Sequence, residues 1–213
     1  MAAGLPSRTV AAFDLDGTLT RRDTLLPFLV LVAGRRRVAA VFARYGLPLI
    51  GSFAGIGDRD AVKEAVVGAI LAGRSADAVS ALGEVFAVRV LANLRSDAQR
   101  RVVQHRQQGH ELVIVSASPA IYVAPIGRLL GAAAVLATEL EVVDGRLTGR
   151  LLGRNCRGPE KVERLRSHLG DETCELWAYG DSSGDTELLA FAGERGCRVG
   201  HTRLTRRPIG FER

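Results

Sequence analysis

The hydrophobic positions of the chain follow two patterns, one before residue 96 and one after it. Residues 10–13 are an apolar run, VAAF, that stops at the polar segment 14–18, DLDGT. Such a run predicts a buried strand that ends in a tight turn. Residues 22–95 then carry apolar side chains three and four positions apart, with no strand pattern. We predict about four helices there, near residues 24–33, 36–50, 59–72 and 76–93.

From residue 96 onward, short apolar runs alternate with amphipathic stretches. The pattern predicts strands over 111–116, 135–140, 175–179 and 197–200, a hairpin over 141–152, and helices over 97–108, 159–169 and 186–192. Another helix is expected to begin at Ser118-Pro119, with Ser118 as its N-cap. Strands that alternate with helices predict a mostly parallel sheet covered by helices on both faces.

These elements predict an α/β fold with two parts. A Rossmann-like core with a mostly parallel sheet would comprise residues 1–21 and 96–213, and an inserted all-helical cap would comprise residues 22–95. We expect hinges where the cap joins the core, near Thr20-Arg21 and Arg95-Ser96. A chain of 213 residues is long enough for such a core and a smaller inserted unit.

The amino-acid composition limits the classes of binding partner and the cellular location that we expect. The net charge of +6 suits acidic partners, such as phosphorylated metabolites, anionic membranes or nucleic acids. Only 5% of the residues are aromatic and no basic stripe is interleaved with aromatic residues, so no nucleic-acid partner is expected. The three cysteines, Cys156, Cys174 and Cys197, lack metal-site spacing and fit small buried residues in a reducing cytoplasm. No signal peptide or run of about 20 apolar residues is visible, so we expect a cytoplasmic protein; peripheral contact of the cap with the inner membrane surface stays open.

Polar side chains follow the predicted strands at the edge where α/β sheets bind ligands. They are Asp14 and Asp16, Ser116 and Ser118, Thr138 and Glu139, and Asp181 and Asp185, with Lys161 on an intervening helix. Two buried carboxylates close together need a compensating cation or proton. The expected cation is one that prefers oxygen ligands, and we expect Mg²⁺.

These motifs, taken in order, carry a family resemblance. Residues 14–18 (DLDGT), Ser116, Lys161 and residues 180–185 (GDSSGD) resemble the four motifs of the haloacid dehalogenase superfamily of phosphatases. The helical insertion resembles the cap of the phosphoserine-phosphatase-like branch, subfamily IB. Residues 115–119 (VSASP), 155–161 (NCRGPEK) and 179–185 (YGDSSGD) are similar to the bacterial subgroup of that branch.

The resemblance implies a role for each motif. Asp14 would be the nucleophile that forms an aspartyl-phosphate, and Asp16 would protonate the leaving oxygen and later deprotonate water. Magnesium would be held by Asp14, Asp181 and the backbone carbonyl of Asp16. Four groups would contact phosphate oxygens, namely Gly17, Thr18, Ser116 and Lys161. Asp185 would orient Lys161 or a metal-bound water.

Two readings remain open for Asp23. In position it matches an acidic residue that faces the substrate amine in phosphoserine phosphatases. It is equally placed to cap the first helix of the insertion.

The substrate is also open. The basic cap segment with which phosphoserine phosphatases bind the substrate carboxylate is not visible in residues 40–72, although Arg44 and Arg59 could substitute for it. The first cap helices are strongly apolar and adjoin residues 35–37, RRR. Either they form the cap's own core, or they serve a lipid-like phosphomonoester, as a resemblance in layout to phosphatidylglycerophosphate phosphatases suggests.

We therefore expect a magnesium-dependent phosphomonoester phosphatase that acts on a small-molecule or lipid-like phosphate. One alternative is a phosphotransferase that uses the same intermediate, because water and an acceptor hydroxyl compete for it. The other alternative is a non-catalytic module that binds a ligand or a membrane surface.

Overall fold

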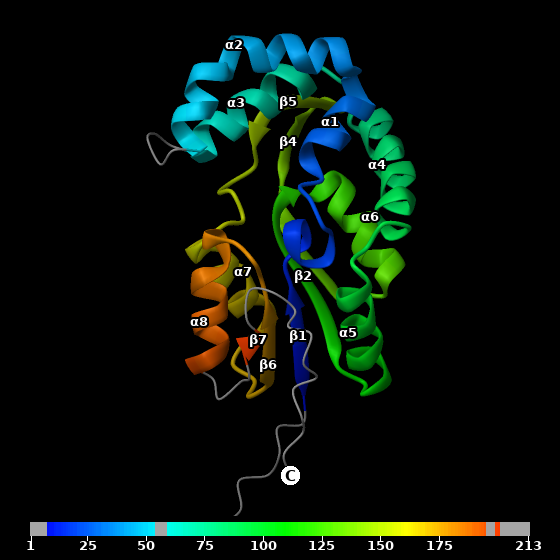
Figure 1. Cartoon of the computed structure of the whole chain (residues 1–213), viewed down its shortest axis with the longest axis vertical. Helices are drawn as coiled ribbons and strands as arrows, with labels where there is room; N and C mark the ends of the chain where they lie inside the picture. Colours follow the sequence, from blue (N-terminus) through cyan, green and yellow to red (C-terminus); the bar gives the residue numbers. More distant parts are fainter. Residues whose placement is uncertain (1–7, 54–58, 195–198, 201–213) are drawn as a thin grey trace, which may run out of the picture.

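The structure is a computed structural model that describes residues 8–53, 59–194 and 199–200. A five-stranded sheet forms the core, with strand order β3-β2-β1-β6-β7 and parallel pairing between neighbours (Figure 1). Its strands are β1 (Thr9–Phe13), β2 (Glu111–Pro119), β3 (Ala134–Thr138), β6 (Glu175–Tyr179) and β7 (Val199–Gly200). The predicted α/β class with a mostly parallel sheet is confirmed.

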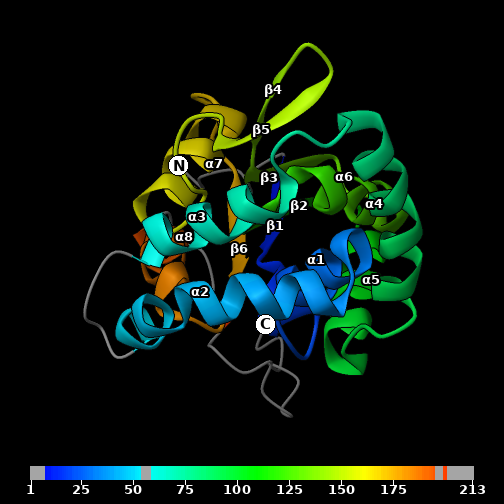
Figure 2. The ribbon, with the colours of Figure 1, turned by 90° about the horizontal axis from the view of Figure 1, so that it is seen from above.

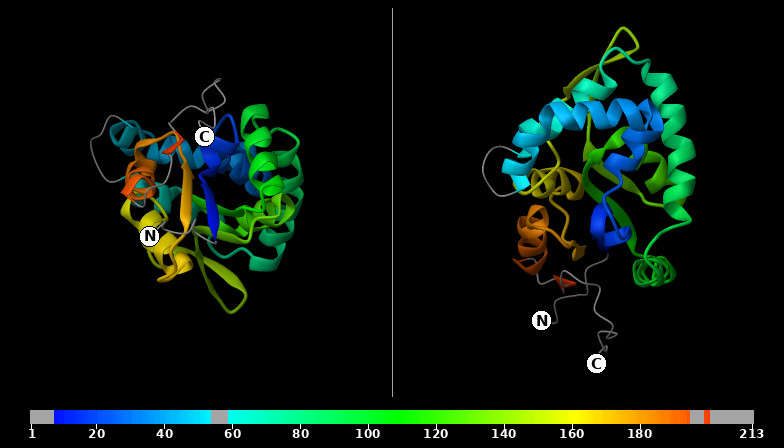
Figure 3. Two further views of the ribbon diagram at one scale, coloured as in Figure 1. Left: turned by 90° about the horizontal axis from the view of Figure 1, so that it is seen from below. Right: turned by 45° about the horizontal axis from the view of Figure 1, so that its top comes forward.

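Helices cover both faces of this sheet (Figure 3). Ala11 and Phe13 of β1 pack in one hydrophobic cluster with α5 (Ser96–Gln107) and α6 (Ala120–Leu130). Val10 and Ala12 point to the opposite face, where α7 (Pro159–Leu169) and α8 (Thr186–Glu194) lie. This alternation follows from the two-residue period of a strand, and it explains why all four side chains are apolar.

The insertion is helical in its described part, as the spacing of its apolar residues predicts. It contains α1 (Leu25–Ala33), α2 (Arg35–Phe53), α3 (Arg59–Leu71) and α4 (Ala76–Leu91). Helices α2 and α3 lie across the end of the sheet at which β1 ends, and α4 descends beside α6 (Figure 1). The cap helices therefore stand over the edge of the sheet that carries the polar motifs.

The two connections between core and insertion lie side by side. Thr20 pairs with Leu94 in an isolated antiparallel bridge, and the backbone amide of Arg95 donates to the carbonyl of Leu19 at 3.0 Å. These are the segments where we expect the hinges. The outgoing and returning chains are thus held to each other at the point where any cap movement would bend them.

A hairpin outside the insertion also joins the cap layer. Strands β4 (Leu140–Val143) and β5 (Arg146–Leu151) pair in an antiparallel sheet of their own, and Figure 2 shows the hairpin extending outward beside α3. Its turn has positive φ at Asp144 and Gly145, as a tight two-residue hairpin requires. The predicted strand 135–140 is wrong in one respect, because β3 stops at Thr138 and the chain turns into β4 at Leu140.

The hairpin is bonded to the α3–α4 connection through the backbone. The amide of Gly73 donates to the Leu147 carbonyl at 2.8 Å, and the amide of Leu147 donates to the Arg74 carbonyl at 2.9 Å. The amide of Ala76 donates to the Gly145 carbonyl at 2.9 Å. The helical insertion and the hairpin therefore form one layer.

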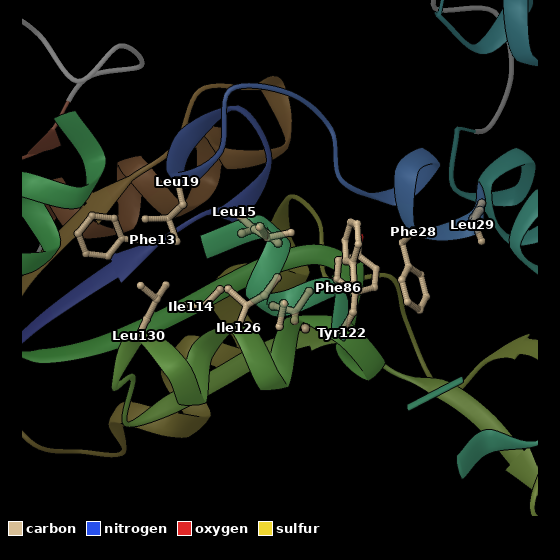
Figure 4. Packing of buried hydrophobic residues seen from close by; sticks show 14 of the residues in the cluster. Phe13, Leu15, Leu19, Phe28, Leu29, Phe86, Ile114, Tyr122, Ile126 and Leu130 are labelled. Atoms are coloured by element: carbon tan, nitrogen blue, oxygen red, sulfur yellow. The ribbon is translucent and has the colours of Figure 1, made fainter. Parts of the chain in front are cut away.

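An aromatic cluster joins this layer to the core. Phe28 of α1 and Phe86 of α4 pack on Tyr122 of α6, with ring centroids 4.5 Å and 5.4 Å from the tyrosine ring (Figure 4). Phe28 and Tyr122 are completely buried. Burial of such large rings is among the strongest contributions to packing, so the cluster fixes α1 and α4 against α6.

Two further expectations concern cysteines and membranes. Cys156 and Cys174 are free and buried, as predicted, whereas Cys197 lies outside the described residues. Among the described residues, no helix combines the length and apolar character needed to cross a bilayer.

Candidate active site

The tight turn η1 (Leu15–Leu19) follows β1 and packs directly on Asp181. Gly17 has φ +85°, and a Cβ placed on it would lie 2.1 Å from Oδ2 of Asp181. The hydroxyl of Thr18 donates to Oδ1 of Asp181 at 3.5 Å. The guanidinium of Arg95 donates to the carbonyl of Gly17 at 2.7 Å. Only glycine combines this backbone conformation with so close an approach, so the turn brings the first and last motifs together.

Lys161 joins two buried carboxylates at the centre of the site. Its ammonium nitrogen lies 2.6 Å from Oδ1 of Asp14 and 2.6 Å from Oδ1 of Asp185. All three side chains are almost fully buried. Burial alone would lower the pKa of Lys161, but the two carboxylates outweigh it and raise that pKa. Lys161 is therefore a permanent cation in the interior.

Asp185 is held rigidly by its own loop. Its Oδ2 accepts hydrogen bonds from the amides of Asp181 and Ser182 and from the Ser182 hydroxyl, the last at 2.7 Å. Burial acts to raise the pKa of Asp185, yet the charge of Lys161 and these hydrogen bonds together hold that pKa below its ordinary value. Both of its oxygens thus have protein partners, one of which is the Lys161 ammonium.

Carboxylate oxygens of Asp14, Asp181 and Asp185 lie within 4.8 Å of one another. Burial raises the pKa of Asp14 to about 7, although Lys161 lowers it, and burial also raises the pKa of Asp181. Asp14 and Asp185 are buried and Asp181 is exposed at the mouth of the cluster, so three carboxylates close to a single lysine leave an excess of negative charge that a divalent cation would offset. An all-oxygen donor set is what Mg²⁺ prefers, so these residues fit that ion.

The carboxylate of Asp16 faces the start of the cap. Its Oδ1 accepts from the amide of Thr24 at 2.7 Å and from the Thr24 hydroxyl at 2.6 Å. Its Oδ2 accepts from the Ser118 hydroxyl at 2.5 Å. Burial raises the pKa of Asp16, and the charge of Asp23 adds to that rise, against the lowering effect of these hydrogen bonds. The net shift favours the protonated acid more than in a free aspartic acid.

The Ser118 prediction is wrong. Strand β2 continues through Pro119, which is itself the N-cap of α6 and makes no side-chain cap bond. The Ser118 side chain instead contacts Asp16, and its backbone amide donates to Oγ of the buried Ser116 at 3.1 Å. A Ser-Pro pair before an apolar helix indicates a cap in sequence, but the long-range partner overrides that local preference.

The capping alternative for Asp23 matches the geometry. Its Oδ1 accepts from the amides of Leu25 and Leu26 at 2.9 Å and 3.2 Å, in the first turn of α1. The side chain is exposed. These bonds satisfy two of the amides that a helix start leaves unpaired.

Sequence reasoning missed a cap residue that reaches the β2 end. The ammonium of Lys63, on α3, donates to the Ala117 carbonyl at 2.5 Å and to Oδ1 of Asn155 at 3.2 Å. The buried Thr138 hydroxyl lies within hydrogen-bond distance of the same two oxygens, at 2.7 Å and 2.8 Å, and can donate its one hydrogen to either. Of the arginines considered as substitutes, Arg44 is exposed and the side chain of Arg59 lies outside the described residues.

Thr24 and Tyr122 were missed as well. Tyr122 is the polar exception in an apolar helix segment, AIYVAPIG, and a buried tyrosine hydroxyl usually has a hydrogen-bond partner. That exception is a usable sequence signal. The identity of the partner, Thr24, depends on the packing of the cap.

Comparison with known proteins assigns the family. A family model described as haloacid dehalogenase-like hydrolase matches residues 11–190. The chain is 40% identical over 195 residues to Protein CicA of Caulobacter vibrioides, covering 89% of this chain and 86% of that one. It is 30% identical over 197 residues to phosphoserine phosphatase SerB1 of Mycobacterium tuberculosis, covering 86% of this chain and 62% of that one.

Solved structures agree in fold. A protein of unknown function from Bordetella pertussis Tohama I superposes with a TM-score of 0.74 at 28% identity, over 93% of this chain and 99% of that one. A phosphoserine phosphatase in its apo form gives a TM-score of 0.63 at 23% identity, over 88% and 84% of the two chains. With four ordered motifs at one sheet edge and a family model that spans most of the sequence, the chain belongs to the haloacid dehalogenase-like hydrolase family.

Proposed function

We propose that the protein is a magnesium-dependent phosphomonoester phosphatase that acts through a phosphorylated Asp14. The observation that carries the proposal is the buried contact of Asp14 with Lys161, with Asp181 beside them. A carboxylate held this way is fixed in position and poised to attack a phosphorus atom. Membership of a hydrolase family and the name of the M. tuberculosis relative support the same reaction class.

The residues divide the work between charge and proton transfer. Asp14 attacks the phosphoryl group, and Asp16 gives a proton to the departing oxygen and later takes one from water. Lys161 and the hydroxyls of Ser116 and Thr18, with the backbone of Gly17, supply positive charge and donors for the phosphoryl oxygens. Bound magnesium, held by Asp14, Asp181 and the Asp16 carbonyl, would offset charge on the transferring group.

The cap is proposed to comprise residues 22–95 and to cover a small substrate. The apolar residues of α1 support this reading: Phe28 and Leu29 are buried, and Leu25 and Leu31 pack against the same cluster. These residues are thus engaged in the core cluster rather than turned toward a ligand, while Leu26 stays 44% exposed. We propose a small phosphorylated metabolite, with phosphoserine as the first ester to test because of the named relative.

Phosphate release across a panel of esters tests the proposal. Wild type, Asp14→Asn and the control Asp171→Asn are assayed with and without Mg²⁺ on p-nitrophenyl phosphate, phosphoserine, phosphocholine, a sugar phosphate and two lipid phosphates. Asp171 is exposed, so its substitution controls for the loss of a carboxylate alone. We expect release that needs Mg²⁺ and Asp14 and that favours a small ester. Release from no ester would overturn the activity, and a preference for lipid phosphates would overturn the substrate class.

A further inference from the structure

The buried contacts of Asp16 go beyond the four motifs. We infer that Ser118, Thr24 and Tyr122 are positioning residues that fix which oxygen of Asp16 carries its proton and tie that oxygen to the seating of the cap. The inference rests on the proposed function, because it concerns the acid of that reaction. It adds three residues, from the β2 end, the start of α1 and helix α6, to the four family motifs.

Thr24 holds Oδ1 of Asp16 as an acceptor. A backbone amide can only donate, and the amide of Thr24 lies 2.7 Å from this oxygen. The Thr24 hydroxyl, at 2.6 Å, adds a second donor to the same atom. Because Oδ1 already accepts two hydrogen bonds, a proton on Asp16 is directed to Oδ2.

Tyr122 fixes the direction of the Thr24 hydroxyl. The two hydroxyl oxygens are 3.1 Å apart. Thr24 has one hydroxyl hydrogen and gives it to Asp16, so Tyr122 must be the donor in this pair. Burial raises the pKa of Tyr122, which keeps its phenol protonated and able to donate. The chain of donors therefore runs from Tyr122 through Thr24 to Asp16.

Ser118 meets the other oxygen. Its hydroxyl lies 2.5 Å from Oδ2 of Asp16, and its side chain is 3% exposed. The backbone of Ser118 is anchored in turn, because its amide donates to Oγ of Ser116. Oδ2 is thus the Asp16 oxygen in contact with the β2 end, two residues from Ser116, and Ser118 holds it there.

The cap takes part through the aromatic cluster. The ring of Tyr122 packs on Phe28 and Phe86, which belong to α1 and α4. Thr24 directly precedes α1. If the cap moved away from α6, the hydroxyls of Thr24 and Tyr122 would separate and Oδ1 would lose its fixed donor. The position of the cap and the orientation of the Asp16 carboxyl therefore depend on the same contacts.

The consequence falls on leaving-group departure. In the first step an Asp14 oxygen bonds to phosphorus, the bond from phosphorus to the ester oxygen breaks, and that oxygen takes the proton from Oδ2 of Asp16. A poor leaving group, such as an alkoxide, depends on this proton, whereas p-nitrophenolate leaves without it. Misaim of Oδ2 should therefore slow alkyl phosphates more than aryl phosphates.

The test compares kcat/KM for an alkyl phosphate and for p-nitrophenyl phosphate on the same protein sample. The ratio of the two values is independent of the fraction of folded enzyme, so a partly unfolded variant remains informative. The variants are Ser118→Ala, Tyr122→Phe and Thr24→Val, with Thr24→Ser as the conservative rescue. Tyr179→Phe is the matched control, because its phenol bonds to His105 and lies outside the network.

We expect Ser118→Ala and Thr24→Val to lower the alkyl-to-aryl ratio on the order of tenfold, a part of the ~10²–10⁴-fold that a general acid contributes. Tyr122→Phe should lower it less, and Thr24→Ser and Tyr179→Phe should leave it unchanged. Asp16→Asn gives the full effect as a reference. Ratios equal to wild type in Ser118→Ala and Thr24→Val, beside a lowered ratio in Asp16→Asn, would overturn the inference alone. An absence of Asp14-dependent release in wild type would overturn the proposed function and this inference with it.

Discussion

Lys161 on α7 holds its ammonium nitrogen 2.6 Å from a carboxylate oxygen of Asp14, 147 positions away in the chain. The side chains are only 2% and 8% exposed. Removing one member of a buried ion pair leaves the other charge without compensation. Lys161 is therefore both a candidate active-site residue and part of the buried core, so its substitution should affect both stability and activity.

Lys161→Met should abolish phosphate release and destabilise the fold by about 3–5 kcal/mol, because Asp14 and Asp185 would stay buried without their cation. Urea unfolding measures the change. Lys161→Met combined with Asp185→Asn should lose less than the sum of the two single variants, since one buried charge is then gone as well.

The control for this experiment is an exposed pair. Arg128 and Glu84 form an ion pair with side chains 64% and 49% exposed. Arg128→Met should therefore change the unfolding free energy by no more than about 1 kcal/mol. Equal losses in the buried and exposed variants would contradict the role given to Lys161.

Magnesium should stabilise the protein against heat even without substrate. The clustered carboxylates favour the ion in the folded state alone, and a ligand at about 100 times its dissociation constant adds roughly 2.7 kcal/mol. We expect the melting temperature to rise with Mg²⁺ in wild type and in Asp171→Asn, and to stay constant in Asp181→Asn. A rise of equal size in Asp181→Asn would place the ion elsewhere.

Gly17→Ala should remove most of the activity. The new Cβ would lie 2.1 Å from Oδ2 of Asp181 and would force the turn away from that carboxylate. Gly34→Ala is the control for a positive φ without a close contact, since Gly34 has φ +80° and open space around it, with ψ 154° in place of the −20° of Gly17. Gly34→Ala should lose only the backbone strain energy, about 1–3 kcal/mol of stability, and keep its activity. Similar kinetics in the two variants would show that contact with Asp181 is unimportant.

His105 should make stability fall in mild acid. Burial lowers its pKa to about 3, helped by the charges of His110 and Arg101, whereas an unfolded histidine titrates near 6.5. Below pH ~6.5 His105 is protonated in the unfolded chain but stays neutral in the folded protein. The unfolding free energy therefore drops by up to ~1.4 kcal/mol per pH unit. The drop continues until the pH approaches the folded value.

Urea unfolding at pH values between 7.5 and 4.5 measures this slope. His105→Gln should flatten it, and the difference between variant and wild type isolates the histidine from the acidic groups. The same slope in both proteins would mean that another group is responsible.

Much of the fold could be predicted from local pattern. The strand at 10–13 and the helices of the insertion follow from the spacing of apolar residues alone, because that spacing reflects the period of each strand or helix. The hairpin turn at Asp144-Gly145 is equally local. Which layer the hairpin joins could not be predicted, since backbone bonds between residues 73–76 and 145–147 leave no mark on side-chain composition.

The candidate site divides in the same way. Asp14, Lys161, Asp181 and Asp185 could be located because short motifs carry them. The prediction for Ser118 is wrong because its hydrogen-bond partner, Asp16, is 102 positions away in the sequence. The helix that Ser118 was expected to cap begins only two residues later, so the local pattern favours the cap. Long-range hydroxyl contacts are specified by packing, and a single sequence does not display packing.

The backbone hydrogen bonds between the β4–β5 hairpin and the α3–α4 connection affect which segments can be exchanged between relatives. A chimera that transplants residues 22–95 from a relative would carry away the α3–α4 connection and leave its backbone partners at Gly145 and Leu147 behind. A functional chimera should therefore exchange the insertion and residues 140–151 together, although the two segments are separate in the sequence. Relatives that handle different esters are expected to vary in both segments together.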